Sequence, residues 1–139
     1  MAVERTLILI KPDAVRRRLV AEILGRIEAR GFTVRAGKLV TASRELGGTH
    51  YAEHTEKPFF GELVEFIMSG PTWALAVEGE GVIATMRKTI GATNPADAEP
   101  GSIRGDLASS MPDNLVHGSD SQESAERELA LWFSPDELG

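Results

Sequence analysis

The stretch RTLILIKPD, residues 5–13, decides how the chain begins to fold. It contains four consecutive apolar residues, and a short continuous apolar run is typical of a strand that is buried on both faces. Pro12 ends the run, because proline has no N–H for a strand ladder and holds the residue before it in an extended conformation. The sequence therefore predicts an interior strand over residues 5–10, with Lys11 at its end.

Outward from this strand, apolar residues recur at helical or strand spacing along most of the chain. Residues 92–114 have no periodicity, and a loop this long is usually functional or disordered. In order, the elements give the βαββαβ pattern of a ferredoxin-like α+β fold. We therefore expect a single domain over residues 1–139, with a four-stranded antiparallel sheet, helices packed on it, a long loop and a C-terminal helix. The patterns predict helices at residues 19–30, 58–69, 82–90 and 119–133, and strands at residues 32–40, 73–77 and 115–117.

Composition narrows the possible functions. The chain has no cysteine, so disulfides, thiolate zinc sites and thiol nucleophiles are excluded. Its net charge of −6 and aromatic content of 6% argue against a ferredoxin-like module that binds nucleic acid, which needs a basic surface and aromatic residues on its sheet. No segment resembles a signal peptide or a membrane span, so we expect a cytoplasmic protein with no membrane partner and no specific nucleic acid.

The segment NLVHGSDS, residues 114–121, carries the strongest chemical signal. It places His117 at the end of a predicted strand and just before a helix, whose N-terminal N–H groups and dipole favour anions. A histidine with an ordinary pKa near ~6.5 is mostly neutral at pH 7 and can act as a nucleophile. Glu128 on the following helix can orient the imidazole, while Ser119 offers a second hydrogen bond and, with Gln122, matches a capping box. The alternative is that His117 only satisfies a strand end.

A histidine that meets a phosphate also needs cations nearby. Lys11 at the end of the first strand, Arg87 near the end of the helix at 82–90 and Arg104 in the long loop are the candidates. Singly, each is more simply explained as a solvated charge or, for Arg87, as a partner of the helix dipole. Phosphoryl transfer needs several such charges at once, because it depends on positioning and on neutralising the transferred group.

Three other motifs carry weaker signals. The basic run Arg16–Arg18 is typical of a solvated or subunit-facing surface. His50 and His54 stand at i, i+4 spacing and could form a metal pair, although the glutamate of the metalloprotease pattern is missing and lone histidine pairs are usually structural. Gly79 and Gly81 lack the other features of a phosphate-binding loop and predict a turn.

Seven motifs spread over the chain form a recognisable set: TLILIKPD (6–13), HY (50–51), KPFF (57–60), SGP (69–71), TNPA (93–96), GSIRGD (101–106) and NLVHGSDSQESAE (114–126). With these motifs, the chain resembles the nucleoside diphosphate kinase family from about residue 5 to residue 133. The blocks IRGD and HGSD together are highly specific to that family.

The resemblance implies a ping-pong phosphotransferase that moves the γ-phosphoryl group of ATP to a nucleoside diphosphate through a phosphorylated His117, supported by Glu128 and Ser119. It implies Mg²⁺ held mainly by the nucleotide phosphates, with few or no metal ligands from the protein. It also implies nucleoside di- and triphosphates as partners and assembly as a homohexamer or, alternatively, a homotetramer. The implied nucleotide contacts are to phosphates from Lys11, Tyr51, Arg87, Thr93 and Arg104, to the sugar from Lys11 and Asn114, and to the base from Phe59.

The chain departs from the family pattern at Ala14, at Leu107 and over Met111–Asp113, and none of these positions carries the chemistry. The pattern therefore leaves the path of the loop over residues 107–113 open. A catalytically inactive interaction protein on the same fold is expected to lose His117 or a phosphate-binding residue, and none is lost. A histidine phosphatase needs an Arg-His-Gly signature, whereas Val116 precedes the histidine here.

Overall fold

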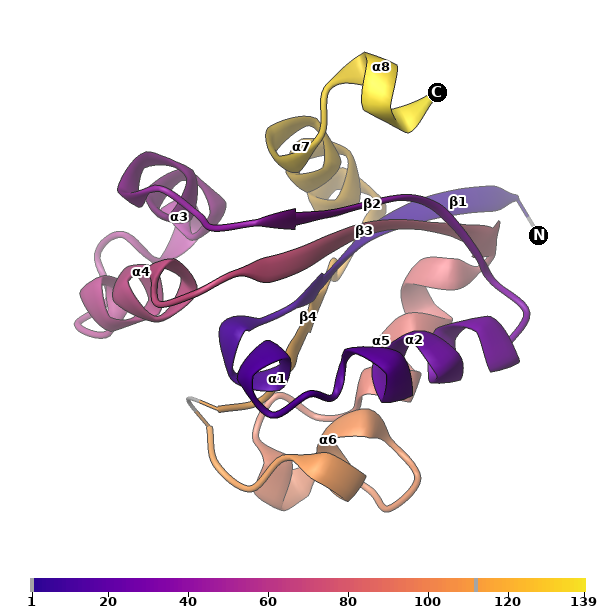
Figure 1. The fold of residues 1–139 in the computed structure, drawn as a ribbon, viewed down its shortest axis with the longest axis horizontal. Coiled ribbons are helices and arrows are strands. Elements are labelled where there is room, and N and C mark those ends of the chain that lie inside the picture. Colours follow the sequence, from indigo (N-terminus) through magenta and orange to yellow (C-terminus); the bar gives the residue numbers. More distant parts are fainter. Residues whose placement is uncertain (1, 112) are drawn as a thin grey trace.

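A four-stranded antiparallel sheet forms the centre of the computed structural model, which describes residues 2–111 and 113–139 (Figure 1). Its order is β2-β3-β1-β4, with β1 in the interior between β3 and β4. This topology is that of a ferredoxin-like α+β fold, so the predicted fold class is confirmed. The strands are β1 (Val3–Ile10), β2 (Thr33–Val40), β3 (Thr72–Glu80) and β4 (Val116–Gly118).

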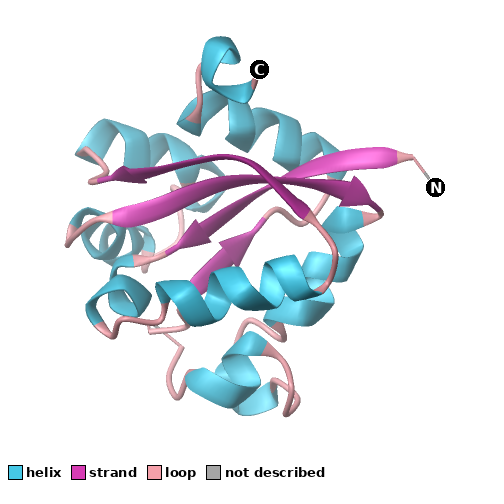
Figure 2. Cartoon of the chain, turned by 45° about the vertical axis from the view of Figure 1, so that its right-hand side comes forward, coloured by secondary structure: helices cyan, strands magenta, loops and turns pink. Residues whose placement is uncertain are grey.

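Helices cover both faces of this sheet (Figure 2). Helices α2 and α5 pack on one face, and α7 packs on the other together with part of α4. No helix among the described residues is long and apolar enough to cross a membrane. The helices are α1 (Pro12–Arg16), α2 (Val20–Ala29), α3 (Arg44–His50), α4 (Phe60–Met68), α5 (Val82–Ile90), α6 (Ile103–Leu107), α7 (Gln122–Trp132) and α8 (Pro135–Leu138), with the 3₁₀ turns η1 (Ala52–His54) and η2 (Pro95–Asp97).

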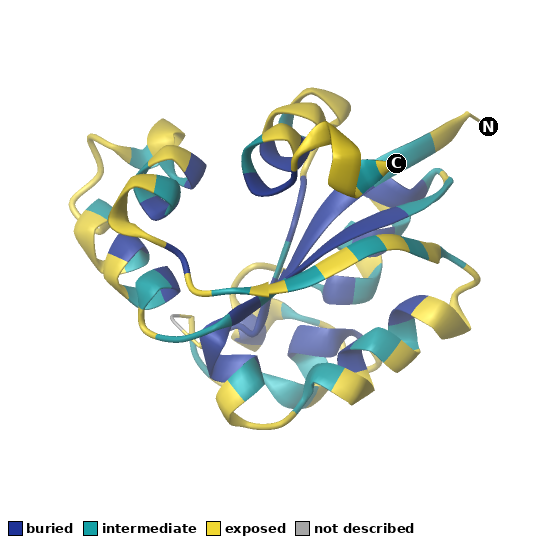
Figure 3. Cartoon of the chain, turned by 45° about the horizontal axis from the view of Figure 1, so that its top comes forward, coloured by how far each residue is buried: buried dark blue, intermediate teal, exposed yellow. Residues whose placement is uncertain are grey.

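The continuous apolar run of β1 is explained by burial on both faces. Ile8 and Ile10 face the core cluster that contains α2 and α5, while Leu7 and Leu9 face the cluster that contains α7. All four side chains are fully buried. Figure 3 colours the strands at the centre of the sheet largely as buried. Burying side chains of this size stabilises the fold by roughly 1.5–3 kcal/mol each. Because Lys11 follows this strand directly, the core fixes its backbone.

Two helices that the sequence patterns did not predict lie close to the candidate site. Helix α3 contains Gly47 and Gly48, which weaken a helical pattern. Gly47 is needed there because a Cβ atom would lie 2.9 Å from Ile67 on α4. Ser43 begins the helix by accepting a hydrogen bond from the backbone N–H of Leu46. Helix α6 is a single short segment inside the expected loop, and Pro112 of that loop lies outside the described residues.

Two local predictions were wrong. The cap of α7 is Ser121, which accepts from the N–H of Ser124, and not Ser119. The predicted turn at Gly79 and Gly81 begins later, because Gly79 still belongs to β3. A side chain there would collide with the Phe32 ring, and only Gly81, at a φ of 61°, turns the chain into α5.

Candidate active site

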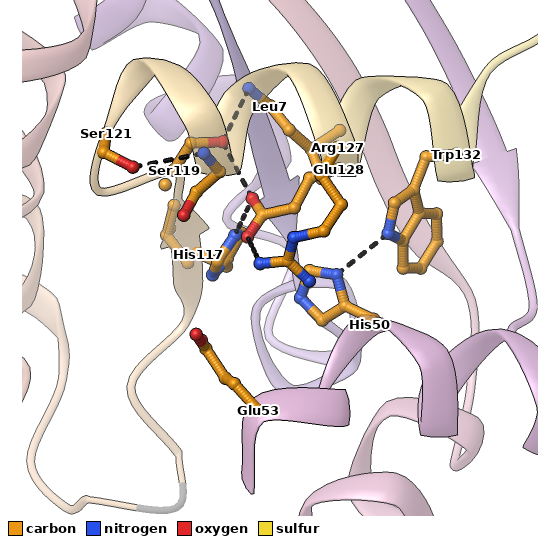
Figure 4. A network of polar contacts seen from close by, with 12 residues as sticks. Leu7, His50, Glu53, His117, Ser119, Ser121, Arg127, Glu128 and Trp132 are labelled. Atoms are coloured by element: carbon orange, nitrogen blue, oxygen red, sulfur yellow. Dashed lines mark hydrogen bonds and ion pairs between the residues drawn. The ribbon is translucent and has the colours of Figure 1, made fainter.

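His117 lies on the short edge strand β4, opposite Leu9 of β1. Its Nε2 atom is 2.8 Å from Oε1 of Glu128, which reaches across from α7 (Figure 4). Glu128 is buried, whereas 24% of the His117 side chain is accessible. The sequence prediction that these two residues meet is therefore correct in geometry.

The hydrogen bonds around Glu128 fix which nitrogen of His117 is available. The Ser119 hydroxyl donates to the same Oε1 atom at 2.8 Å, and it accepts from the backbone N–H of Leu7 at 3.2 Å. Burial on its own raises the pKa of the Glu128 carboxyl, but hydrogen bonds from His117 and Ser119 outweigh it and leave this pKa below its usual range. An ionised carboxylate only accepts, so Nε2 carries a proton and Nδ1 keeps a free lone pair.

A second histidine packs against the first. The rings of His50 and His117 meet edge to face with centroids 4.7 Å apart. The Trp132 indole N–H donates to Nδ1 of His50 at 3.1 Å, and burial with the nearby His117 lowers the pKa of His50 to about 3. His50 is therefore uncharged at neutral pH, and its ring packs against one side of His117. The sequence pattern allowed a metal pair with His54 but favoured a structural role, and nothing in it indicated that His50 would end α3 beside His117.

Arg104 is buried at the N-terminal end of α6, not solvated in a loop. Its guanidinium donates to three backbone oxygens: Nε to Asn114 at 3.1 Å, Nη1 to Gly91 at 3.1 Å and Nη2 to Val116. Burial and the neighbouring Arg87 lower the pKa of Arg104 to about 10, which leaves it charged at neutral pH. Arginine has five N–H donors, so two remain for an anion.

Lys11 is also buried, and its ammonium group donates to the side-chain oxygen of Asn114. Burial lowers the pKa of Lys11 to about 8, with Asp13 acting in the opposite direction. The amide of Asn114 in turn donates to the backbone oxygen of Thr93 at 3.1 Å. The structure therefore links Lys11 and Arg104, two of the three predicted cations, through Asn114 in one buried group.

Three further predicted residues have contacts of their own. Arg87 donates to the backbone oxygen of Gly118 at 3.0 Å, beside His117. Tyr51 packs edge to face on His50, and burial raises the pKa of its hydroxyl to about 12. Phe59 is 44% exposed just before α4, with the His54 ring centroid 6.0 Å from its own and the Lys57 ammonium group 5.6 Å from its ring centroid.

Other candidate motifs stay outside the site. Arg16 donates to Ser69 and Arg17 to the backbone of Leu107, so the basic run forms surface contacts. Among residues 2–111 and 113–139, no group of three or more acidic or histidine side chains could hold a metal ion. A nucleophilic nitrogen, an orienting carboxylate and several converging cations suit attack on an anionic phosphorus centre.

Comparison with known proteins gives one consistent answer. A family model described as nucleoside diphosphate kinase matches residues 4–138. The chain is 64% identical to the nucleoside diphosphate kinase of Rubrobacter xylanophilus, covering 94% of this chain and 98% of the relative. It is 58% identical to the nucleoside diphosphate kinase of Halalkalibacterium halodurans, covering 97% and 92%.

Solved structures agree. A nucleoside diphosphate kinase from Halobacterium salinarum in complex with CDP superposes with a TM-score of 0.96 at 45% identity, covering 99% of this chain and 92% of that one. The enzyme from Aquifex aeolicus gives a TM-score of 0.96 at 42% identity, covering 99% of this chain and all of that one.

Proposed function

The chain belongs to the nucleoside diphosphate kinase family, and from this premise we propose that His117 carries the phosphoryl group in its reaction. The function is transfer of the γ-phosphoryl group of a nucleoside triphosphate to a nucleoside diphosphate. The observation that supports His117 is its Nε2 hydrogen bond to Glu128, which leaves Nδ1 free.

In the proposed first half-reaction, the Nδ1 lone pair attacks the γ-phosphorus. The N–P bond forms while the bond from phosphorus to the β–γ bridging oxygen breaks, and the nucleoside diphosphate leaves with that electron pair. The imidazole becomes positive as the bond forms, and the Glu128 carboxylate stabilises this charge through Nε2–H. The second half-reaction is the reverse, with a different diphosphate as acceptor. Ser119 keeps Glu128 in place through its hydroxyl donation to Oε1.

The cations around His117 fit the phosphates. We propose that Arg104, Arg87 and Lys11 hold the transferred group, because Arg104 has two unused donors and Arg87 lies beside the His117 backbone. Tyr51 and Thr93 would join them. Lys11 with Asn114 would bind the sugar hydroxyls, and the exposed ring of Phe59 would stack on the base.

We propose that Mg²⁺ enters with the nucleotide. Mg²⁺ prefers oxygen ligands, keeps several waters and is often held mainly by substrate phosphates. The donor set of the site fits this, since its groups near His117 are mainly cations and hydrogen-bond donors. The ion would neutralise charge on the phosphate oxygens.

We further propose that the whole chain acts as one domain, in the cytoplasm, as a homohexamer, with a homotetramer as the alternative. Among the described residues, β2 is an edge strand with no partner on its outer side, and it carries Leu39, which is 52% exposed, so this edge is available for self-association. Light scattering should give six protomers. A monomer would contradict the assembly, whereas a tetramer would select the alternative.

The phosphohistidine is tested by incubation with γ-labelled ATP, followed by acid and alkali treatment of the protein. We expect phosphate that is labile in acid and stable in alkali, and we expect none in His117→Ala. The chain has three histidines, so His54→Ala and His50→Gln are matched controls that should still be labelled. Label that persists in His117→Ala would show that another residue carries the phosphate.

A further inference from the structure

The backbone at Leu115 has an unusual conformation in the middle of the candidate site. Leu115 has a φ of 73°, and the N–H of Val116 donates to the oxygen of Asn114 at 2.8 Å, which makes a tight three-residue turn. A residue other than glycine rarely adopts this conformation, because its Cβ is crowded there. The side chain of Leu115 is fully buried, so glycine would lose its packing.

Two contacts from the Lys-Pro-Asp segment hold both peptide groups of this residue. The backbone N–H of Lys11 donates to the oxygen of Leu115 at 2.9 Å. The N–H of Leu115 donates to Oδ2 of Asp13 at 3.0 Å, from the first turn of α1. Asp13 is 4% exposed, and its Oδ1 has no hydrogen-bond partner among the described residues. The carboxylate also lies close enough to the two buried cations to raise the pKa values of Lys11 and Arg104, but its one hydrogen bond goes to the turn at Leu115.

The turn matters because it positions two backbone oxygens that bind Arg104. The guanidinium donates to the oxygen of Asn114, the first residue of the turn, and to the oxygen of Val116, the last. A different backbone conformation at Leu115 would move both acceptor oxygens and so rotate the Arg104 guanidinium. The orientation of the guanidinium matters because the group is planar and rigid, so its two remaining N–H donors have fixed directions.

We propose that Asp13 is a positioning residue for phosphoryl transfer: its carboxylate holds the turn at Leu115 and thereby aims the Arg104 guanidinium at the transferred group. This rests on the proposed phosphate-binding role of Arg104. Among the described residues, the Asp13 side chain hydrogen-bonds to the backbone of Leu115 and not to His117, so its proposed action passes through the turn. The alternative is that Asp13 only stabilises α1, because an acidic residue in the first turn of a helix interacts favourably with the helix dipole.

Two substitutions separate these roles. Asp13→Asn keeps an oxygen acceptor in place but removes the charge, whereas Asp13→Glu keeps the charge but displaces the acceptor by one methylene group. If position is what matters, kcat/KM should fall less than about fivefold in Asp13→Asn and at least about thirtyfold in Asp13→Glu. The dipole role predicts the opposite order. Because the Asp13 charge raises the pKa of Lys11, the pH profile of kcat/KM is measured for every variant and the variants are compared at the maxima of their profiles.

The control variant is Glu4→Ala. The Glu4 carboxylate also accepts from a backbone N–H, that of Ile83 at 3.3 Å, but at the other end of β1. We expect Glu4→Ala to lower the thermal stability about as much as the Asp13 variants do, but to lose much less kcat/KM than Asp13→Glu. A loss of activity in Glu4→Ala that equals the loss in Asp13→Glu would mean that the effect is only one of stability.

A double-mutant cycle with Arg104→Lys tests the route. If Asp13 acts through the guanidinium, Asp13→Glu should lower kcat/KM by no more than about threefold once Arg104 is lysine. Additive losses in a slow Arg104→Lys enzyme would contradict the Asp13 proposal and leave the role of Arg104 intact. An Arg104→Lys enzyme with wild-type activity would contradict the proposed role of Arg104, and the Asp13 proposal with it.

Discussion

The two ends of the proposed nucleotide site are built in different ways. At the chemical end, formed by His117, Glu128, Ser119, Lys11 and Arg104, nearly every polar group has a partner inside the fold. The proposed base end consists of the Phe59 ring, which is 44% exposed, and we add Met111 to it as a second exposed apolar residue, 53% exposed, on the loop after α6. Preorganised charges and donors at the chemical end lower the activation free energy of phosphoryl transfer. A base end with few polar contacts discriminates little between bases.

The largest effect should come from the chemical end, in Arg104→Ala. Loss of one charged donor to a transferring group typically costs about 3–4 kcal/mol, or roughly a hundredfold to a thousandfold in kcat. The same change leaves three backbone oxygens without their guanidinium donor. We therefore expect the free energy of unfolding to fall by roughly 2–5 kcal/mol.

Arg87→Ala is the matched comparison, since Arg87 donates to a single backbone oxygen. It should slow kcat to a similar extent with a much smaller shift in the denaturant midpoint. A change confined to KM in both variants would reduce the two arginines to docking charges, and equal destabilisation would contradict the difference in their anchoring.

The second effect should appear as pH dependence. Burial lowers the pKa of Lys11 to about 8, so its charge is complete below that pH and is lost as the pH rises through it. We therefore expect kcat/KM to fall about tenfold per unit above pH 8. Tyr51 and Arg104, with pKa values of about 12 and about 10, titrate later. In Lys11→Arg this limb should move to higher pH, and an unchanged limb would assign it to another group.

The base end should give a smaller effect, visible as a broad substrate range. Strong discrimination requires buried polar groups that the wrong base leaves unpaired, and stacking on Phe59 accepts any base. Across ADP, GDP, CDP, UDP and dTDP we expect kcat/KM to vary by about 10- to 100-fold, or roughly 1.4–3 kcal/mol, with purines ahead. One base favoured by more than about a thousandfold would reveal a polar contact to the base.

The smallest effect should come from Phe59→Ala. Stacking contributes about 1–3 kcal/mol per base, and a half-exposed ring belongs at the low end of that range. KM should rise roughly fivefold with kcat almost unchanged. Met111→Ala is the control on the other exposed residue. A fall in kcat for Phe59→Ala would show that the two ends are coupled more closely than their structures suggest.

The two ends also differ in how well the sequence predicted them. The pairing of His117 with Glu128 followed from a strand end and a helix, and the cations followed from the need for several charges. The burial of the cations was not predicted. Arg104 is buried because it lies in α6, and a helix of five residues is too short to show a helical pattern of apolar residues. His50 and Asp13 were not recognised, since their roles depend on contacts with Trp132 and Leu115 that lie 82 and 102 residues away along the chain.

The interior position of β1 has a consequence for the newly made chain. β1 is synthesised before the other three strands of the sheet, yet Leu7, Leu9 and Lys11 meet their partners Ser119, His117 and Leu115 only after more than a hundred further residues have been added. Contacts that are distant in sequence form slowly, because a long loop must close before they contribute. A nascent or truncated chain can therefore collapse around β1 and β3 while His117 is still unable to react. Acquisition of acid-labile phosphate would then report completion of folding, since it requires the last strand to have docked.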